Sequence, residues 1–409
     1  MIETTALLQT LMQRFGIYWL FPSQYLKYLE LLPVILISFL LAFLLTPLIG
    51  HLAIKFKITD DPNGLRTARF NKYDNPERHI HKKRTPYLGG LAVLIPLIIG
   101  LLIFFKPNDI TVPLLIALLI LIVAGILDDV FNLPPQVQLG LQIIASTIIA
   151  ASVADLTFVN NPFGGIINLN FAQLSGTFLK LNWRLVFVGD LLIIPWIILC
   201  INAVKWVGGS DGLMEGNMLI AYILLMLLGI RDQNVLITVL SAIMTGGISA
   251  FLIFNFPPAK IFSGSTGKTV FGFLIATLAF IQGAKFATAI LILALPLIDS
   301  LFVLVKRYID YKPKNLLQLM RYNDTNHLHH QLLEMNFSAR QVLLIELSIT
   351  LLTGSIAVVT VGAFKFFAIL IVGLMLIIGI LLIHRKAQKE KIKKQEEVKK
   401  QTPESKYSY

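Results

Sequence analysis

The sequence predicts an all-α membrane protein that crosses the bilayer many times. Of its 409 residues, 56% are apolar and only 14% are charged, whereas a soluble domain carries about 25% charged residues. The apolar residues form long blocks, and a helix needs about 20 of them to cross the hydrocarbon core. These observations exclude a soluble enzyme and a disordered chain. The single cysteine, Cys200, lies inside an apolar block, which also excludes a disulfide-stapled secreted domain.

Eleven apolar blocks predict eleven transmembrane helices, with ends defined to within a few residues. The least distinct boundary, between the eighth and ninth blocks, is at Gln282-Gly283-Ala284-Lys285. The predicted spans are 33–54, 88–105, 112–127, 139–155, 184–204, 216–230, 235–256, 269–284, 286–305, 341–361 and 364–383.

Three further stretches are too polar to be spans. Residues 156–183 contain an alternating run, from Ile166 to Ala172, that predicts a short β-hairpin. Residues 306–340 form a polar, histidine-rich segment. Residues 385–409 mix lysine with glutamate, which predicts a basic tail that is a solvated helix or disordered. We therefore expect one membrane domain over 1–384, followed by the tail.

Basic residues predict the orientation, because cytoplasmic loops carry an excess of lysine and arginine. With the tail in the cytoplasm, 27 of the 35 lysines and arginines fall on the cytoplasmic side and 8 on the other. The sequence thus predicts a multi-pass protein of the cell membrane with its N-terminus outside and its C-terminus inside. The β-hairpin then lies outside, and every polar cluster lies at the cytoplasmic face.

The first polar cluster is the adjacent pair Asp128 and Asp129, at the end of the third predicted helix. The two carboxylates repel each other, and both oppose the negative end of the helix dipole. The pair is either a solvated helix end or a site for phosphate chemistry.

Two more clusters follow predicted helices. Asn202, Lys205 and Asp211 flank a glycine-rich turn, and such turns expose N–H groups that hold anions. The run 254–269 includes Asn255, Phe262 and the sequence Gly-Ser-Thr-Gly-Lys268-Thr. This run is not a P-loop, because Phe262 occupies the position where the P-loop requires its first glycine.

The fourth cluster, His327, His329 and His330, contains three histidines within four residues. Such a cluster can ligate a metal, bind phosphate or lie at an aqueous surface. No cysteine or glutamate pattern supports zinc, so the residues alone predict no metal ligand.

Together with Arg78-His-Ile-His81 and Thr85-Pro86-Tyr-Leu-Gly89-Gly90, these runs resemble the polyprenyl-phosphate N-acetylhexosamine-1-phosphate transferases. That family includes the lipid-linked GlcNAc-1-phosphate transferases and phospho-N-acetylmuramoyl-pentapeptide transferase. The similarity covers about residues 60 to 335 and includes Pro296-Leu-Ile-Asp299.

The resemblance implies transfer of a sugar-1-phosphate from a UDP-sugar to polyprenyl phosphate in cell-envelope glycan assembly, normally with magnesium. It implies membrane lipids as the surroundings and no nucleic-acid partner, and it leaves a homodimer open. The implied catalytic residues are Asp128, Asp129 and Asp211; the implied substrate-binding residues are His81, Asn202, Lys205, Asn255, Phe262, Lys268, His327, His329 and His330.

The sequence departs from the family pattern at five positions. The pattern has asparagine and aspartate where this chain has Lys205 and Gly208, and aspartate and serine where it has Ser265 and Lys268. A lysine that usually follows the aspartate pair is Gln138. The lost asparagine and aspartates are the positions that hold magnesium in the family, and lysine binds phosphate as a point charge.

These departures leave two classes of function. The first is a divergent transferase, favoured by the retained aspartate pair and histidines. The second is a metal-free homologue without turnover that binds lipid phosphate or nucleotide-sugar. A transporter is less consistent, because the spans lack paired glycine- or proline-broken helices at the midplane.

Overall fold

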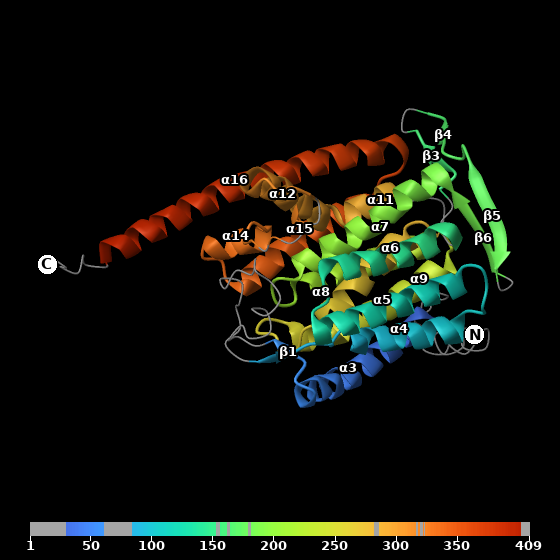
Figure 1. Ribbon diagram of the computed structural model, residues 1–409, viewed down its shortest axis with the longest axis horizontal. Coiled ribbons are helices and arrows are strands. Elements are labelled where there is room, and N and C mark those ends of the chain that lie inside the picture. Colours follow the sequence, from blue (N-terminus) through green and yellow to red (C-terminus); the bar gives the residue numbers. More distant parts are fainter. Residues whose placement is uncertain are drawn as a thin grey trace, which may run out of the picture.

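The protein is a bundle of long helices, seen in a computed structural model that describes residues 30–60, 84–152, 156–161, 164–178, 181–281, 286–315, 318–319, 322 and 324–401. Figure 1 shows most of these helices running side by side, with β5 and β6 at one end of the bundle and β1 and α14 at the other. A helix satisfies its own backbone hydrogen bonds, which is what a chain this apolar requires inside a bilayer.

Each of the eleven predicted spans overlaps a helix or a helix pair, and the predicted ends 153–155 and 282–284 lie outside the described residues. The first eight correspond to α3 (Leu31–Lys55), α4 (Leu91–Phe104), α5 (Thr111–Phe131), α6 (Pro135–Ser152), α7 (Phe187–Val207), α8 (Leu213–Arg231), α9 (Val235–Asn255) and α10 (Gly264–Leu278). The last two correspond to α15 (Ala339–Val359) and α16 (Gly362–Gln401).

The ninth predicted span, 286–305, is not one straight helix. It is a pair, α11 (Phe286–Ile292) and α12 (Ala294–Tyr311), bent by 78° at Leu293. Because α12 continues to Tyr311, the polar segment predicted from residue 306 begins as helix. A further short helix, α14 (Leu328–Glu334), contains two of the clustered histidines.

The predicted hairpin is present, and a second one accompanies it. Strand β4 (Ile166–Asn168) pairs with β3 (Phe158–Asn160) in antiparallel register, as expected from the alternating run. Strands β5 (Gln173–Phe178) and β6 (Leu181–Val186) form the other hairpin. At the opposite end, β1 (Thr59–Asp60) pairs with β2 (Thr85–Pro86).

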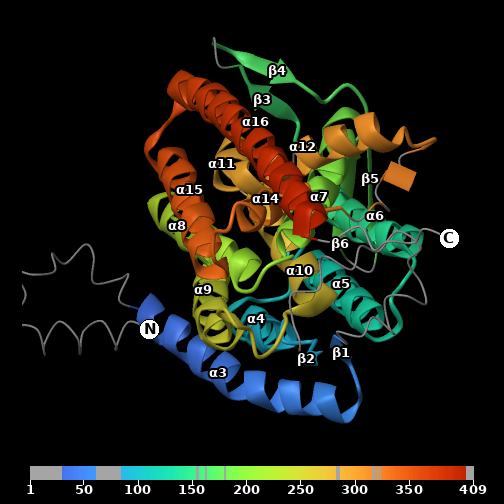
Figure 2. The ribbon, with the colours of Figure 1, turned by 90° about the vertical axis from the view of Figure 1, so that its left-hand side faces the viewer.

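Helix α10 lies at the centre of the bundle and carries one wall of the site described below. Thirteen of its fifteen residues are buried. It packs against α5 and α7 most extensively, and also against α4 and α8, as the end-on view in Figure 2 shows. α10 begins five residues before the predicted span, at Gly264.

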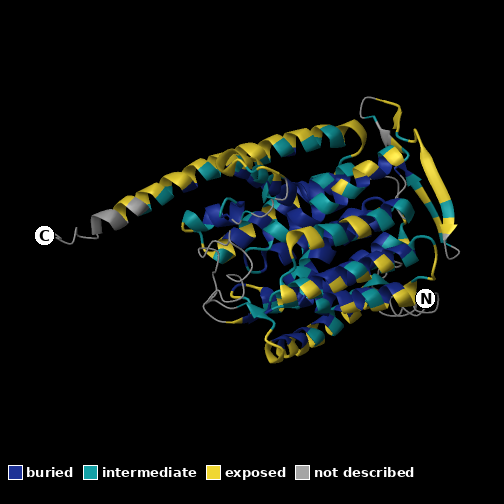
Figure 3. Cartoon of the chain, in the orientation of Figure 1, coloured by how far each residue is buried: buried dark blue, intermediate teal, exposed yellow. Residues whose placement is uncertain are grey.

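Helices α3 and α16 are the most exposed, as Figure 3 shows. Their outward residues are large and apolar, among them Leu44, Phe364 and Met375, which is the composition of a lipid-facing surface. Helix α16 has 40 residues, which corresponds to about 60 Å. It runs without interruption from the last predicted span into the basic tail.

Seven described helices are long and apolar enough to cross a membrane: α3, α5, α7, α8, α9, α15 and α16. The bent pair would make eight, whereas α4 and α10 have only 14 and 15 residues. The protein is therefore a multi-pass membrane protein, while the number of spans and their orientation remain predictions.

The predicted orientation can be tested by cysteine labelling in intact cells, in a Cys200→Ala background. Cysteines at the exposed positions Gln136 and Lys260, at the α14 end, should react only after the membrane is permeabilised. Cysteines at Asn168 and Ser175, in the hairpins, should react in intact cells. Labelling of Gln136→Cys from outside would contradict the orientation.

Candidate active site

The two adjacent aspartates at the end of α5 have different surroundings. Asp129 is buried and binds the first turn of α10: its Oδ1 accepts from the Ser265 N–H at 2.7 Å. Its Oδ2 accepts from the N–H and hydroxyl of Thr266, at 3.2 and 2.7 Å. The N-terminus of a helix carries unsatisfied N–H groups and a partial positive charge. Asp129 therefore acts as the cap of α10 from a neighbouring helix.

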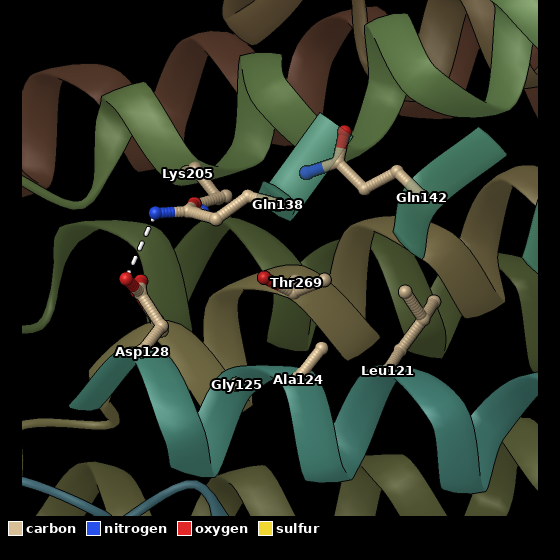
Figure 4. Close-up of a pocket in the computed structure, with 9 residues that line it drawn as sticks. Leu121, Ala124, Gly125, Asp128, Gln138, Gln142, Lys205 and Thr269 are labelled. Atoms are coloured by element: carbon tan, nitrogen blue, oxygen red, sulfur yellow. Dashed lines mark hydrogen bonds between the residues drawn. The ribbon is translucent and has the colours of Figure 1, made fainter. Parts of the chain in front are cut away.

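Asp128 is half-buried and faces a small pocket (Figure 4). Its Oδ1 accepts from the Leu133 N–H at 2.9 Å and from Nε2 of Gln138 at 2.8 Å. No described residue donates a hydrogen bond to its Oδ2. One oxygen thus organises the turn between α5 and α6, and the other is available to a ligand.

Gln138 links Asp128 to Lys205 on the last turn of α7. The Lys205 ammonium donates to Oε1 of Gln138 at 2.6 Å, on the opposite side of the amide from Asp128. One helical turn away, Asn202 donates to Oε1 of Gln142 at 2.9 Å. Two side-chain bridges therefore join α6 to α7 beside the pocket. Its lining residues are Leu121, Ala124, Gly125, Asp128, Gln138, Gln142, Lys205, Ser265 and Thr269.

Asp211 and Asn255 hold the glycine-rich turn 208–212 against the loop that precedes α10. Oδ2 of Asp211 accepts from the Ala259 N–H at 2.8 Å. Asn255 accepts from the Gly212 N–H at 2.9 Å and donates to the Ile261 carbonyl at 2.7 Å. Lys268 extends from α10 to the start of this turn, where its Nζ donates to the Gly208 carbonyl at 2.7 Å.

Phe262 is part of the contact between this loop and the segment before α4. Its N–H donates to the Pro86 carbonyl, and its own carbonyl accepts from the Gly89 N–H, each at 2.9 Å. Its ring lies 5.8 Å from the ring of Tyr87. The half-buried Phe262 ring therefore forms an aromatic pair at the site end of the bundle. His81 lies outside the described residues.

The three histidines lie close together and are buried. Nδ1 of His327 is 2.7 Å from Oδ2 of Asp299, whose Oδ1 accepts from the Leu328 N–H at 2.8 Å. The His329 ring is 5.7 Å from that of His327 and 4.3 Å from that of His330. Asp299 therefore fixes the entry to α14 and the orientation of the first histidine.

Three supporting residues have no local sequence signal. Arg307 pairs with Asp324 at 2.5 Å, and its guanidinium lies 5.6 Å from the Trp206 ring. Trp206 also approaches the His327 ring, at 6.4 Å. These contacts join α12, the histidine segment and the end of α7, which are far apart along the chain. Only a spatial arrangement could identify them.

Known proteins share sequence similarity with this chain. Residues 111–283 match the family model described as glycosyl transferase family 4. The chain is 26% identical over 358 residues to the probable undecaprenyl-phosphate N-acetylglucosaminyl 1-phosphate transferase of Bacillus subtilis, covering 86% of this chain and 90% of that relative. It is 30% identical over 259 residues to phospho-N-acetylmuramoyl-pentapeptide-transferase of Oceanobacillus iheyensis, covering 60% and 74%.

The chain belongs to glycosyl transferase family 4. The resemblance seen in the sequence is confirmed, and the matched region contains Asp128, Asp129, Lys205, Asp211 and Lys268. A second pentapeptide-transferase relative, from Clostridium botulinum, is 28% identical over 252 residues, covering 61% of this chain and 74% of that relative.

Family membership implies magnesium, but the donor set here does not fit that ion. Magnesium takes oxygen ligands in near-octahedral geometry. Both Asp129 oxygens accept hydrogen bonds from α10, and the Lys205 ammonium lies one amide away from Asp128.

Asp129→Ala should lower the melting temperature of the detergent-solubilised protein more than Asp128→Ala does. Removing Asp129 leaves three donors at the start of α10 without their acceptor, and hydrogen bonds to a charged group contribute about 1.5–3 kcal/mol each. Thr266→Val, which deletes one of the three donors, should have an intermediate effect. Equal melting temperatures for Asp129→Ala and wild type would contradict the capping role.

Proposed function

We propose that this protein transfers a sugar-1-phosphate from a UDP-N-acetylhexosamine to polyprenyl phosphate at the cytoplasmic face of the cell membrane, in cell-envelope glycan assembly. The observation that carries the proposal is Asp128, a carboxylate with one oxygen anchored by Leu133 and Gln138 and the other directed to a pocket. The activities for which the Bacillus and Oceanobacillus relatives are named support the same reaction class.

The reaction is a phosphoryl transfer. An oxygen of the lipid phosphate forms a bond to the phosphorus that carries the sugar, and the bond from that phosphorus to the bridging oxygen breaks. UMP leaves with the bonding electrons, and the lipid becomes a polyprenyl diphosphate bearing the sugar. Asp128 accepts a proton from the lipid phosphate and later returns it to solvent. Such reactions depend mainly on positioning and on stabilising charge.

The remaining site residues position the donor in this proposal. Asp211 and Asn255 keep the 208–212 turn in place, and Phe262 with Tyr87 offers aromatic surface for the uracil ring. The histidines face the substrate phosphates or the sugar, with His327 oriented by Asp299. Asp129 fixes the start of α10 and hence Ser265 and Thr269 in the pocket wall.

A second candidate is a homologue that binds these substrates without turnover. The lysines at positions 205 and 268 favour it, because they stand where the family pattern has an asparagine and a serine. The two candidates differ in a single measurable product, since both bind substrate but only the transferase releases UMP.

The deciding experiment incubates purified protein with undecaprenyl phosphate and UDP-N-acetylglucosamine, or with UDP-N-acetylmuramoyl-pentapeptide as the other donor. Release of UMP together with a lipid-linked sugar is the expected result. Substrate binding without UMP under any condition would favour the second candidate.

Asp128→Asn should reduce the rate of UMP release by about a hundredfold, the scale of a lost acid–base group. Asp109→Asn is the matched control, because Asp109 is a carboxylate bonded to Asn182 at the hairpin end of the bundle. It should retain the wild-type rate. An Asp128→Asn variant with full turnover would remove this residue from the proposed mechanism.

A further inference from the structure

We propose that Lys205 and Lys268 provide fixed positive charge for the phosphate groups of the substrates, so that phosphate binding at this site requires no divalent metal ion. The inference rests on the proposed function for the identity of the substrates. Its own basis is the placement of the two ammonium groups near the 208–212 turn and the hydrogen bonds that Asp129 and one oxygen of Asp128 already accept.

Lys205 is a half-buried cation whose hydrogen-bond partner is neutral. Its Nζ donates to the amide oxygen of Gln138 at 2.6 Å, and it makes no direct ion pair among the described residues. The carboxylates of Asp128 and Asp129 still act on it through space. An ammonium has three donors, and burying a charge without a charged partner is costly. An anion in the pocket beside Lys205 would satisfy both requirements.

Lys268 places a second cation in the first turns of α10. A positive side chain there is disfavoured by the helix dipole, which is positive at this end. Its Nζ donates to the Gly208 carbonyl at 2.7 Å. The charges of Lys268 and Asp211 both act on the buried carboxyl group of Glu215, with opposite sign. The ammonium brings a positive charge to the turn at Gly208, where a phosphate would meet a point-charge donor.

The glycine-rich turn between the two lysines lets side chains approach its backbone closely. Lys268 contacts Gly208, three residues after Lys205. A Cβ at Gly208 would lie 2.8 Å from Nζ of Lys268, and one at Gly209 would lie 2.6 Å from Nε2 of His329. Glycine at both positions therefore brings Lys268 and His329 to the backbone beside the Lys205 pocket.

The nearby carboxylates already accept hydrogen bonds from neutral donors. The three donors from α10 stabilise the Asp129 charge, and Asp128 is bonded to a backbone amide and to Gln138. The oxygen ligands that a divalent cation needs are thus already used in part, while Lys205 lines the same pocket as Asp128 and Lys268 reaches the turn at Gly208. Lysine binds phosphate well as a point charge, and this arrangement uses two of them.

Phosphate esters reach the site from two sources, the lipid monophosphate and the nucleotide-sugar diphosphate. The test is therefore a pair of calorimetric titrations of the full-length protein in detergent. One uses UDP-N-acetylglucosamine and the other undecaprenyl phosphate. Each is run with excess EDTA and with excess magnesium, and the arm that responds to the lysine variants identifies the source.

We expect wild-type affinity for at least one probe to be the same, within about threefold, in EDTA and in magnesium. Lys205→Met and Lys268→Met should each weaken that binding in EDTA by roughly tenfold to a hundredfold, the range for a lost hydrogen bond to a charged group. The losses should shrink at high salt. Lys205→Arg, which keeps the charge, should retain more affinity than Lys205→Met.

Lys306→Met is the matched control, because the partly exposed Lys306 pairs with Asp310 one turn along α12. It should bind both probes as wild type does. Gel filtration and melting temperature establish that each variant is folded. The wild-type comparison of EDTA with magnesium needs no variant and tests the proposal even if a lysine variant does not fold.

Wild-type binding that disappears in EDTA and returns with magnesium would overturn the proposal, as would unchanged affinity in both lysine variants. Absence of binding to either probe would overturn it too. The outcomes separate this proposal from the proposed function: metal-insensitive binding without UMP release keeps the lysine site and rejects the transferase. UMP release together with substrate binding that requires magnesium would reject the lysine site and keep the transferase.

Discussion

The site depends on one buried carboxylate, that of Asp129, which joins the end of α5 to the beginning of α10. Its hydrogen bonds to Ser265 and Thr266 determine where α10 starts. They thereby place Thr269 in the pocket wall and Lys268 beside Gly208. The adjacent Asp128 can then face the pocket, because its neighbour carries the structural role. Two neighbouring carboxylates at a helix end are tolerated here since a second helix supplies the opposing positive dipole.

The polar ends of the helices are connected by loops that bond to one another. The 208–212 turn is held by Asp211 and Asn255, and the segment before α4 is held through Phe262. Asp299 orients the histidine segment. Within a membrane protein such polar contacts gather where the chain reaches water, and the apolar remainder of each helix faces lipid or its neighbours.

The sequence predicts the helices well because a span needs a long apolar run, which is a local property. It misses the bend at Leu293, because residues 286–297 are apolar apart from Thr288 and are predicted as part of one span, although Pro296, three residues past the bend, is a signal that a helix can end there. The polar clusters were visible as motifs, yet the roles of Asp129 and Asp211 in joining elements depend on partners more than 40 residues away. The pairing of Arg307 with Asp324 is equally invisible, because nothing local selects that partner.

Gln138 and Lys205 face each other across the groove between α6 and α7, with one hydrogen bond between their side chains. In the family pattern that the sequence resembles, the lysine stands at position 138 and an amide residue at position 205. This chain differs from that pattern at both positions. In the structure α7 supplies the ammonium and α6 the amide, so the pocket still has one positive charge from this pair, supplied by α7. A substitution at either position is therefore coupled to the residue at the other.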